Sequence, residues 1–209
     1  CQSLNLSSEC VFTSEIKPHA ITILKQNNPQ NEIHGDITKI NEKEIPDFDF
    51  LLAGFPCQSF SIMGKMQGFN DTRGTMFFEI ERILAYHKPK VILLENVKRL
   101  TTHDNGKTFA VILEKLKELG YTIYYKVLNS LHFGVPQKRE RIYIVGFLNP
   151  IVFKFPLPLG YYKPLNEILE DDNEVADSYF LSEEIKQKRL SMVKGEPPYP
   201  SIWHENIGG

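Results

Sequence analysis

The residue with the clearest chemical potential is Cys57, which lies in the run Gly54–Ser61 (GFPCQSFS). It follows an apolar run, Phe48–Phe55, that predicts a strand buried on both faces. Pro56 fixes the backbone just before the thiol, which would stand at the carboxyl end of that strand, where a doubly wound sheet binds its ligand. A thiolate there could act as a nucleophile. The alternative is a small buried hydrophobe, which free cysteines usually are.

Charged side chains also stand at the ends of two other apolar runs. Glu95, the first residue of the sequence ENV, follows the predicted strand Val91–Leu94. A carboxylate there suits a site, although a capping or solvated role is the alternative. Arg139 and Arg141 are two apart at the entry to a predicted strand that ends at Phe147, so they would point to the same side. That side could hold an anion or a base edge, whereas a short charge run is otherwise a solvated loop.

Glu15 and Asp36 each end a short strand-like run. An acidic residue in this position binds ribose hydroxyls in nucleotide-binding sheets, although the signal is weak when it stands alone. The polar loop Ser59–Gly74 carries glycines at 64, 68 and 74 and could move as a lid. The six histidines show no metal-ligand spacing, so we predict no metal site and expect His87 and His103 on helix and loop surfaces.

The elements that would position these residues alternate between strands and helices. Apolar spacing predicts helices at Lys17–Gln26, Thr75–Ala85 and Thr108–Leu119, the last closed by Gly120. Further strands are predicted at Cys10–Thr13, Tyr121–Leu128 and Arg141–Phe147. This alternation predicts an α/β fold with a doubly wound, mostly parallel sheet and helices on both faces.

The residue pattern changes after Phe147, where prolines and glycines interrupt the apolar spacing. An acidic run, Glu170–Asp172, follows. Ser182 is placed to cap a helix that reaches Leu190. We expect a linker and the beginning of another unit. The chain starts without Met and stops on turn residues, so both of its ends look cut.

The composition is that of an ordinary globular protein, with 42% hydrophobic and 24% charged residues among 209. It argues against collagen-like, coiled-coil and wholly disordered chains. No run approaches the roughly 18 apolar residues of a membrane helix. Three cysteines make no disulfide framework, so a reducing, intracellular setting is expected. The net charge of −2, taken alone, argues against a nucleic-acid partner, yet residues 82–141 carry 12 Lys and Arg against 5 Asp and Glu.

Taken in order, these segments resemble the DNA (cytosine-5) methyltransferases of bacterial restriction–modification systems. GFPCQSFS resembles that family's nucleophile motif, ENV its catalytic-glutamate motif and QKRERIYIVGF its arginine-bearing motif. Arg73–Phe78 (RGTMFF) resembles the segment that flanks the cofactor, and Gly35–Thr38 (GDIT) the adenine-contacting turn. The likeness covers Glu15 to Phe147 and implies the Rossmann-like sheet of S-adenosylmethionine-dependent methyltransferases, incomplete at both ends.

The resemblance implies a mechanism on a cytosine that is flipped out of duplex DNA. Cys57 would add to carbon 6 as a thiolate, and Glu95 would hold a proton near N3. Arg141, with Arg139 beside it, would bind the cytosine O2 and the nearby backbone. S-adenosyl-L-methionine would donate the methyl group. The cofactor-binding residues implied by the resemblance are Glu15, Ile16, Asp36, Ile37, Pro56 and Met76.

The chain departs from the family pattern in several places, and the segments missing at both ends predict a fragment. The glycine-rich first motif is absent, and Ile16 stands where many relatives place a tryptophan against the adenine. Most of the target-recognition domain and the last two motifs are also missing. We therefore expect residues 1–148 to form a catalytic domain without its first strand, and residues 149–209 a linker and the start of the recognition domain. A chain of this extent is expected to bind cofactor poorly and not to select a DNA sequence.

Two alternatives stay open at this point. One is an RNA (tRNA) cytosine-5 methyltransferase, although that branch tends to show a PPCQPF run where this chain has FPCQSF. The other is a non-catalytic nucleic-acid-binding remnant. The leading interpretation implies duplex DNA as partner, leaves room for a cognate restriction endonuclease acting on the same site, and predicts a monomer without membrane association in the bacterial cytoplasm, at the nucleoid.

Overall fold

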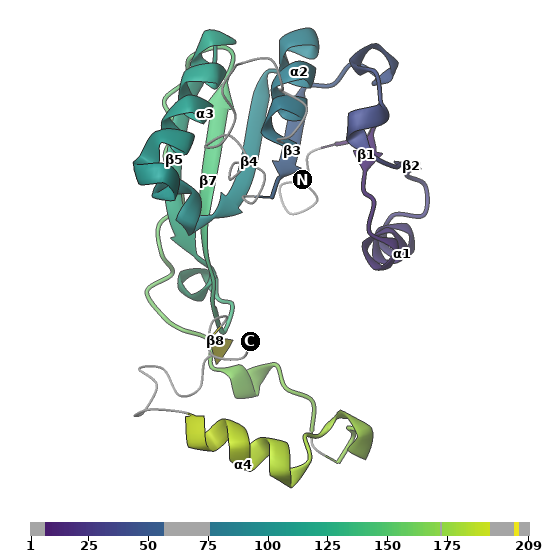
Figure 1. Ribbon diagram of the computed structural model, residues 1–209, viewed down its shortest axis with the longest axis vertical. Coiled ribbons are helices and arrows are strands. Elements are labelled where there is room, and N and C mark those ends of the chain that lie inside the picture. Colours follow the sequence, from purple (N-terminus) through teal and green to yellow (C-terminus); the bar gives the residue numbers. More distant parts are fainter. Residues whose placement is uncertain (1–6, 57–75, 172, 193–202, 205–209) are drawn as a thin grey trace. The chain divides into compact units, whose positions relative to one another are not determined.

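The computed structural model describes residues 7–56, 76–171, 173–192 and 203–204. The chain divides into two compact units (Figure 1). The first contains Cys1–Lys126 and Ile142–Phe153, and the second contains Val127–Arg141 and Lys154–Gly209. In the described part of the chain, no helix is both long and apolar enough to cross a membrane.

The first unit begins with a small strand–helix–strand arrangement. Strands β1 (Thr13–Ser14) and β2 (Ile33–His34) pair in parallel and are connected through helix α1 (Pro18–Asn27). Proline at the first helical position needs no N–H partner, which favours a helix start there. The predicted helix is confirmed within one residue at each end, whereas β1 lies at the very end of the predicted strand Cys10–Thr13 and runs past it.

The central sheet contains four strands: β3 (Phe50–Gly54), β4 (Val91–Val97), β5 (Thr122–Asn129) and β7 (Glu140–Phe147). Their order is β3-β4-β7-β5 (Figure 1). Strands β3 and β4 are parallel. The amide of Leu148, just after β7, donates to the carbonyl of Lys90, just before β4, at 3.0 Å. Strand β7 therefore runs antiparallel to β4, and the sheet is mixed.

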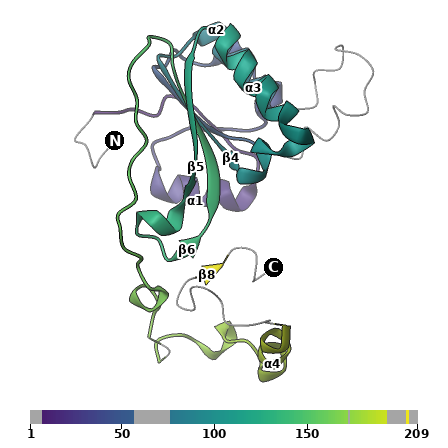
Figure 2. The same cartoon turned by 90° about the vertical axis from the view of Figure 1, so that its left-hand side faces the viewer.

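Helices α2 (Met76–His87) and α3 (Lys107–Glu118) lie side by side over one face of this sheet (Figures 1 and 2). Both confirm the predicted helices, and Gly120 follows α3 with a φ of 97°, in the left-handed conformation that favours glycine. The core between helices and sheet consists of buried apolar side chains: Phe77, Ile80, Ile83, Leu84, Ile92, Leu94, Phe109, Ile112, Leu116, Ile142 and Ile144.

The prediction that the strand ending at Phe55 is buried on both faces is wrong for β3. Phe50 is 44% exposed and Leu52 is 65% exposed, whereas Leu51 and Ala53, which point the other way, are half-buried. In the described part of the chain, β3 is at the edge of the sheet and pairs only with β4, so its side chains have fewer neighbours than those of a central strand. Among the described residues, only one of its faces is covered.

His87 also departs from the sequence prediction, because its side chain is 2% exposed rather than on the helix surface. Its Nε2 lies 2.8 Å from the carbonyl oxygen of Glu42, which can only accept, so Nε2 carries the proton. Its Nδ1 lies 3.3 Å from a carboxylate oxygen of Asp47. The ring thus connects the end of α2 to the short 3₁₀ turn η3 (Glu42–Glu44). His103 is half-buried, with Nδ1 2.7 Å from Thr108 Oγ1.

The second unit holds the remaining elements. The 3₁₀ turn η8 (Ser130–Phe133) precedes β6 (Gln137–Lys138), which pairs in parallel with β8 (Trp203–His204). Two further 3₁₀ turns, η9 (Leu165–Glu167) and η10 (Asp177–Tyr179), lead to helix α4 (Glu183–Met192). The hydroxyl of Ser182 accepts from the amide of Ile185 at 3.4 Å, which confirms the predicted cap.

We expect Gly146→Ala to destabilise the sheet by about 1–3 kcal/mol, since overpacking a well-packed core costs that much. A methyl group at residue 146 would stand 2.7 Å from Cγ1 of Ile92 and 2.8 Å from Cδ1 of Ile123, both closer than real contacts allow. Urea unfolding followed by circular dichroism measures the effect. Gly35→Ala is the control, because nothing lies within 4 Å of its added methyl group. Equal midpoints for the two variants would contradict the packing account.

Candidate active site

The predicted nucleophile Cys57 and the loop Ser59–Gly74 lie outside the described residues. The structure does describe the approach to them. Strand β3 ends at Gly54, Phe55 is buried with 7% exposure, and Pro56 is exposed. The ring of Phe55 packs at a centroid distance of 5.9 Å from that of Phe77 in α2, which anchors the chain two residues before the predicted nucleophile.

Glu95 lies at the corresponding end of the neighbouring strand. In the parallel register of β3 and β4, it is the partner of Gly54. Its Oε2 would stand 3.5 Å from a methyl group on residue 54, so the carboxyl group is next to the Gly54 backbone. Because parallel strands have their carboxyl ends on the same side of a sheet, ENV at the end of β4 lies beside the residues that follow β3 and precede Cys57.

Asn96 links these two strand ends and was missed by sequence reasoning. It is 2% exposed, and its Nδ2 donates to the carbonyl of Phe55 at 2.6 Å. Its Oδ1 accepts from the amide of Val97 at 2.8 Å. A signal was present in the sequence: Asn96 continues the alternation of Ile92 and Leu94, which face the core. A polar side chain in that phase must find partners, because a buried polar group left unpaired is costly.

We expect Asn96→Ala to lower stability by about 1–3 kcal/mol, since it leaves the buried carbonyl of Phe55 without a donor. We also expect the methyl transfer that the resemblance implies to fall by about tenfold or more, because that carbonyl lies two residues before the predicted nucleophile. Asn96→Asp should behave in the same way despite its similar size, since an ionised carboxylate donates no hydrogen bond. Urea unfolding and initial rates measure the two effects.

Thr108→Val is the matched control, because Thr108 is also buried and the substitution removes a different, partly buried hydrogen bond, the one between Thr108 and His103. It should cost stability and leave the rate at saturating substrate unchanged. Methyl transfer at the unaltered rate by a folded Asn96→Ala protein would show that Asn96 supports only the fold.

Glu15 and Asp36 follow the carboxyl ends of β1 and β2. Because these two strands are parallel, the two residues lie on the same side of the strand pair. Oε1 of Glu15 accepts from the amides of Ile16 at 2.8 Å and Lys17 at 2.9 Å. The hydrogen bond from Lys17, followed by that from Ile16, outweighs partial burial and holds the pKa of Glu15 below its usual value. Ile16, beside it, is 65% exposed.

The carboxylate of Asp36 caps the N-terminus of the 3₁₀ turn η2 (Ile37–Lys39). Its Oδ1 accepts from the Thr38 hydroxyl at 2.8 Å and the Thr38 amide at 3.1 Å. These two hydrogen bonds, the one from the hydroxyl first, lower the pKa of Asp36. Ile37, the other predicted adenine contact, is half-buried. The turn is therefore built around an ionised carboxylate.

The remaining predicted site residues lie on other elements. Met76 is the first residue of α2 and is half-buried. Arg139 and Arg141 belong to the second unit. Arg139 stands between β6 and β7, where its amide donates to Asn129 Oδ1 at 3.1 Å and its carbonyl accepts from the amide of Ser130 at 3.0 Å. Arg141, the second residue of β7, donates from Nη1 to the carbonyl of Glu140 at 2.9 Å.

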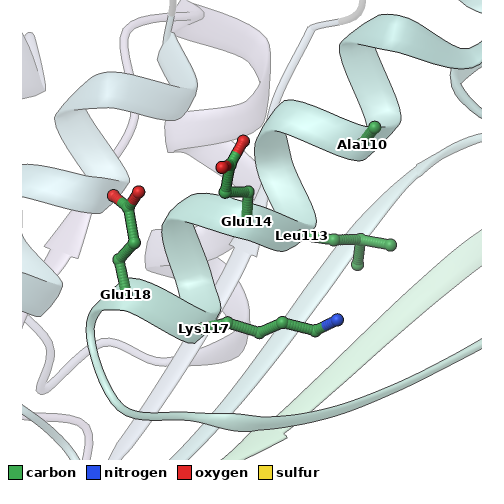
Figure 3. Close-up of a pocket in the computed structure, with 5 residues that line it drawn as sticks. All are labelled: Ala110, Leu113, Glu114, Lys117 and Glu118. Carbon is green, nitrogen blue, oxygen red and sulfur yellow. The ribbon is translucent and has the colours of Figure 1, made fainter.

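A shallow hollow of about 540 Å³ lies on the outer side of α3 (Figure 3). All of its lining residues come from this one helix: Ala110, Leu113, Glu114, Lys117 and Glu118. Their spacing of three and four places them on one helical face. Since no second element contributes, this hollow is a feature of the helix surface, and none of the predicted site residues lines it.

The fold is that of a known class of enzymes. The chain is similar to a crystal structure of a mutant of Spodoptera frugiperda DNMT2, with a TM-score of 0.73 and 27% identity over 97% of this chain and 63% of that one. It is also similar to the Entamoeba histolytica methyltransferase EhMeth, with a TM-score of 0.74 and 24% identity over 92% of this chain and 60% of that one. These likenesses confirm the predicted α/β, Rossmann-like fold of S-adenosylmethionine-dependent methyltransferases.

The sequence narrows this class to one family. The model of the family described as C-5 cytosine-specific DNA methylase matches residues 3–203, and the chain belongs to that family. It is 60% identical over 199 residues to the Type II methyltransferase M.NgoBI of Neisseria gonorrhoeae. It is 61% identical over 199 residues to the Type II methyltransferase M.HaeII of Haemophilus aegyptius. Each match covers 95% of this chain and 62% of the relative's length. The predicted likeness to restriction–modification methyltransferases is confirmed.

Proposed function

We propose that the protein to which this chain belongs transfers a methyl group from S-adenosylmethionine to carbon 5 of a cytosine in duplex DNA. The observation that supports this most directly is the pairing of the β3 and β4 ends. Glu95 lies against Gly54, and Asn96 binds the Phe55 carbonyl, so the two catalytic motifs leave one edge of the sheet together. Ligands of doubly wound sheets bind at that edge.

The edge formed by β1 and β2 fits the cofactor. In the described part of the chain, both hydrogen bonds to Glu15 fall on Oε1, and both to Asp36 fall on Oδ1. Each carboxylate therefore keeps a second oxygen that can accept from a ligand. We propose that Glu15 binds the ribose hydroxyls and that Asp36, Ile37 and Ile16 contact the adenine. Pro56 and Met76 complete the set, and the bound sulfonium supplies the methyl group.

The chain's own residues would activate the base in two linked steps. The Cys57 thiolate forms a bond to carbon 6, and its electron pair moves into the ring. Glu95 gives a proton to N3, which neutralises the charge and leaves an enamine whose carbon 5 is nucleophilic. After methylation, a base removes the proton from carbon 5. The ring then expels Cys57 as a thiolate, returns the N3 proton to Glu95 and becomes aromatic again.

We further propose that Arg141, with Arg139 beside it, binds the cytosine O2 through charge-assisted hydrogen bonds. The target atom is hidden in the stacked duplex, so the cytosine must be flipped into the site before Cys57 can reach it. The basic segment 82–141, with 12 Lys and Arg against 5 Asp and Glu, would attract the phosphate backbone locally.

The proposed organisation places the catalytic domain in residues 1–148, and a linker with the start of the target-recognition domain in residues 149–209. We propose a monomer that acts on duplex DNA in the bacterial cytoplasm, at the nucleoid, beside a restriction endonuclease that cleaves the same site. Digestion of genomic DNA from a strain that expresses the full-length protein tests the last point, since methylated sites would resist that endonuclease.

The direct test uses the full-length protein with tritiated S-adenosylmethionine and two acceptors, duplex DNA and tRNA. Tritium should enter the DNA as 5-methylcytosine, identified by nuclease digestion and chromatography. Incorporation into tRNA alone would replace the proposal with the RNA-directed activity. Binding of either nucleic acid without any transfer would favour a non-catalytic binding protein.

A further inference from the structure

Arg82, on helix α2, makes several hydrogen bonds with protein groups, unlike a cation that is solvated at the surface. Its guanidinium group reaches three separate elements: its own helix α2, the turn η3 and the turn η2. Nε and Nη2 donate to Oε2 of Glu79 at 3.0 and 2.8 Å. Nη1 donates to Oε2 of Glu42, and Nη2 also donates to the carbonyl of Ile37 at 3.2 Å.

These contacts lie in a partly buried setting. The exposed fractions of the side chains are 30% for Arg82, 26% for Glu42 and 19% for Glu79. Burial disfavours the charged guanidinium, but the hydrogen bonds to Glu79 and Glu42 outweigh it, so the pKa of Arg82 is raised and the group stays charged. Salt therefore screens this network less than it screens exposed pairs.

The contact with Ile37 connects this network to the turn proposed to bind the adenine. The carbonyl of Ile37 belongs to the turn that Asp36 caps, and both residues are the proposed adenine contacts. A lysine could not hold the same arrangement, because its single ammonium lacks the planar fork that reaches two carboxylates and a carbonyl at once. The helix that presents Arg82 begins at Met76, another proposed cofactor residue.

We propose that Arg82 is a positioning residue that holds the turn of Asp36 and Ile37 in the shape that takes the adenine of the cofactor. This role rests on the proposed function of that turn. Arg82 itself touches neither cofactor nor cytosine in this account. It fixes the Ile37 carbonyl from one side while Asp36 fixes the start of the turn from the other.

The test measures S-adenosylmethionine and S-adenosylhomocysteine binding by calorimetry on the full-length protein, together with steady-state kinetics. We expect Arg82→Ala to raise the Kd of both ligands about tenfold, which corresponds to about 1.4 kcal/mol. The KM for S-adenosylmethionine should rise in parallel. The kcat at saturating cofactor and the KM for DNA should stay within about twofold, because the residues that contact the base are untouched.

Lys115→Ala is the matched control. Lys115 is 34% exposed on α3 and forms an ion pair with Glu118, so its removal also deletes one partly exposed cation and breaks its ion pair with a carboxylate. It should leave both Kd values unchanged. A coupling test combines Arg82→Ala with Asp36→Asn, and we expect the double variant to bind little worse than the weaker single variant, because both act on one turn.

Two outcomes would overturn the role of Arg82. These are unaltered cofactor affinity in Arg82→Ala, whether or not its melting temperature falls, and fully additive losses in the double variant. If Arg82→Ala does not fold, Arg82→Lys decides: about threefold weaker binding supports the role, and unchanged binding refutes it. Failure of the unaltered protein to bind S-adenosylmethionine would instead refute the proposed function, and this role with it.

Discussion

Cys57→Ser should lose methyl transfer by at least about 10³-fold, while the protein still binds DNA and cofactor. The reason is that the attack on carbon 6 needs an ionised nucleophile. A cysteine thiol is readily deprotonated near neutral pH, whereas a serine hydroxyl stays protonated unless a strong base lies beside it. Tritium transfer to duplex DNA under saturating conditions measures the loss, and calorimetry measures the retained binding.

Cys10→Ser is the matched control for this variant. Cys10 is the free cysteine among the described residues, and it is exposed, with its sulfur 3.2 Å from Thr13 Oγ1. This control should transfer methyl groups at the unaltered rate. A duplex with 5-fluorocytosine at the target should trap a covalent adduct with the unaltered protein and with Cys10→Ser, but not with Cys57→Ser. Full activity in Cys57→Ser would exclude the covalent mechanism.

The second large effect is expected for Glu95→Gln, which should reduce the rate of methyl transfer by about 10²–10⁴-fold, the usual contribution of a general acid. Glutamine has nearly the shape of glutamate, so the contact with Gly54 and the ends of β3 and β4 should persist. It cannot deliver a proton to N3, however, and the negative charge that the thiolate brings to the ring would stay uncompensated. Single-turnover kinetics with labelled cofactor isolates this step from product release.

Glu114→Gln provides the comparison for Glu95, because Glu114 is an exposed carboxylate on α3, far along the chain from either motif. The Glu114→Gln variant should transfer methyl groups at the rate of the unaltered protein. The melting temperatures of both variants should lie close to that of the unaltered protein, so that a loss of rate reflects chemistry. A single-turnover rate within threefold of normal in Glu95→Gln would assign the proton at N3 to another group.

Much of the scaffold follows from local spacing in the sequence. The helices α2 and α3 bury residues such as Phe77, Leu84 and Leu116 at helical intervals, and the turn at Gly120 needs a conformation that glycine adopts easily. Strand β4 begins with a continuous apolar run, Val91–Leu94, and Glu95 follows that run. These signals depend on neighbours within a few residues, so the sequence alone sufficed to predict these elements and their order. The motifs also determined the family.

The tertiary structure decided which residues hold the site in place. The Asn96–Phe55 hydrogen bond spans 41 positions of the chain, and the contact of Arg82 with Ile37 spans 45. The exposure of Leu52 and the antiparallel course of β7 likewise depend on which strands become neighbours. Such contacts follow from strand register and helix packing, which bring distant residues together, and local periodicity carries no information about that choice.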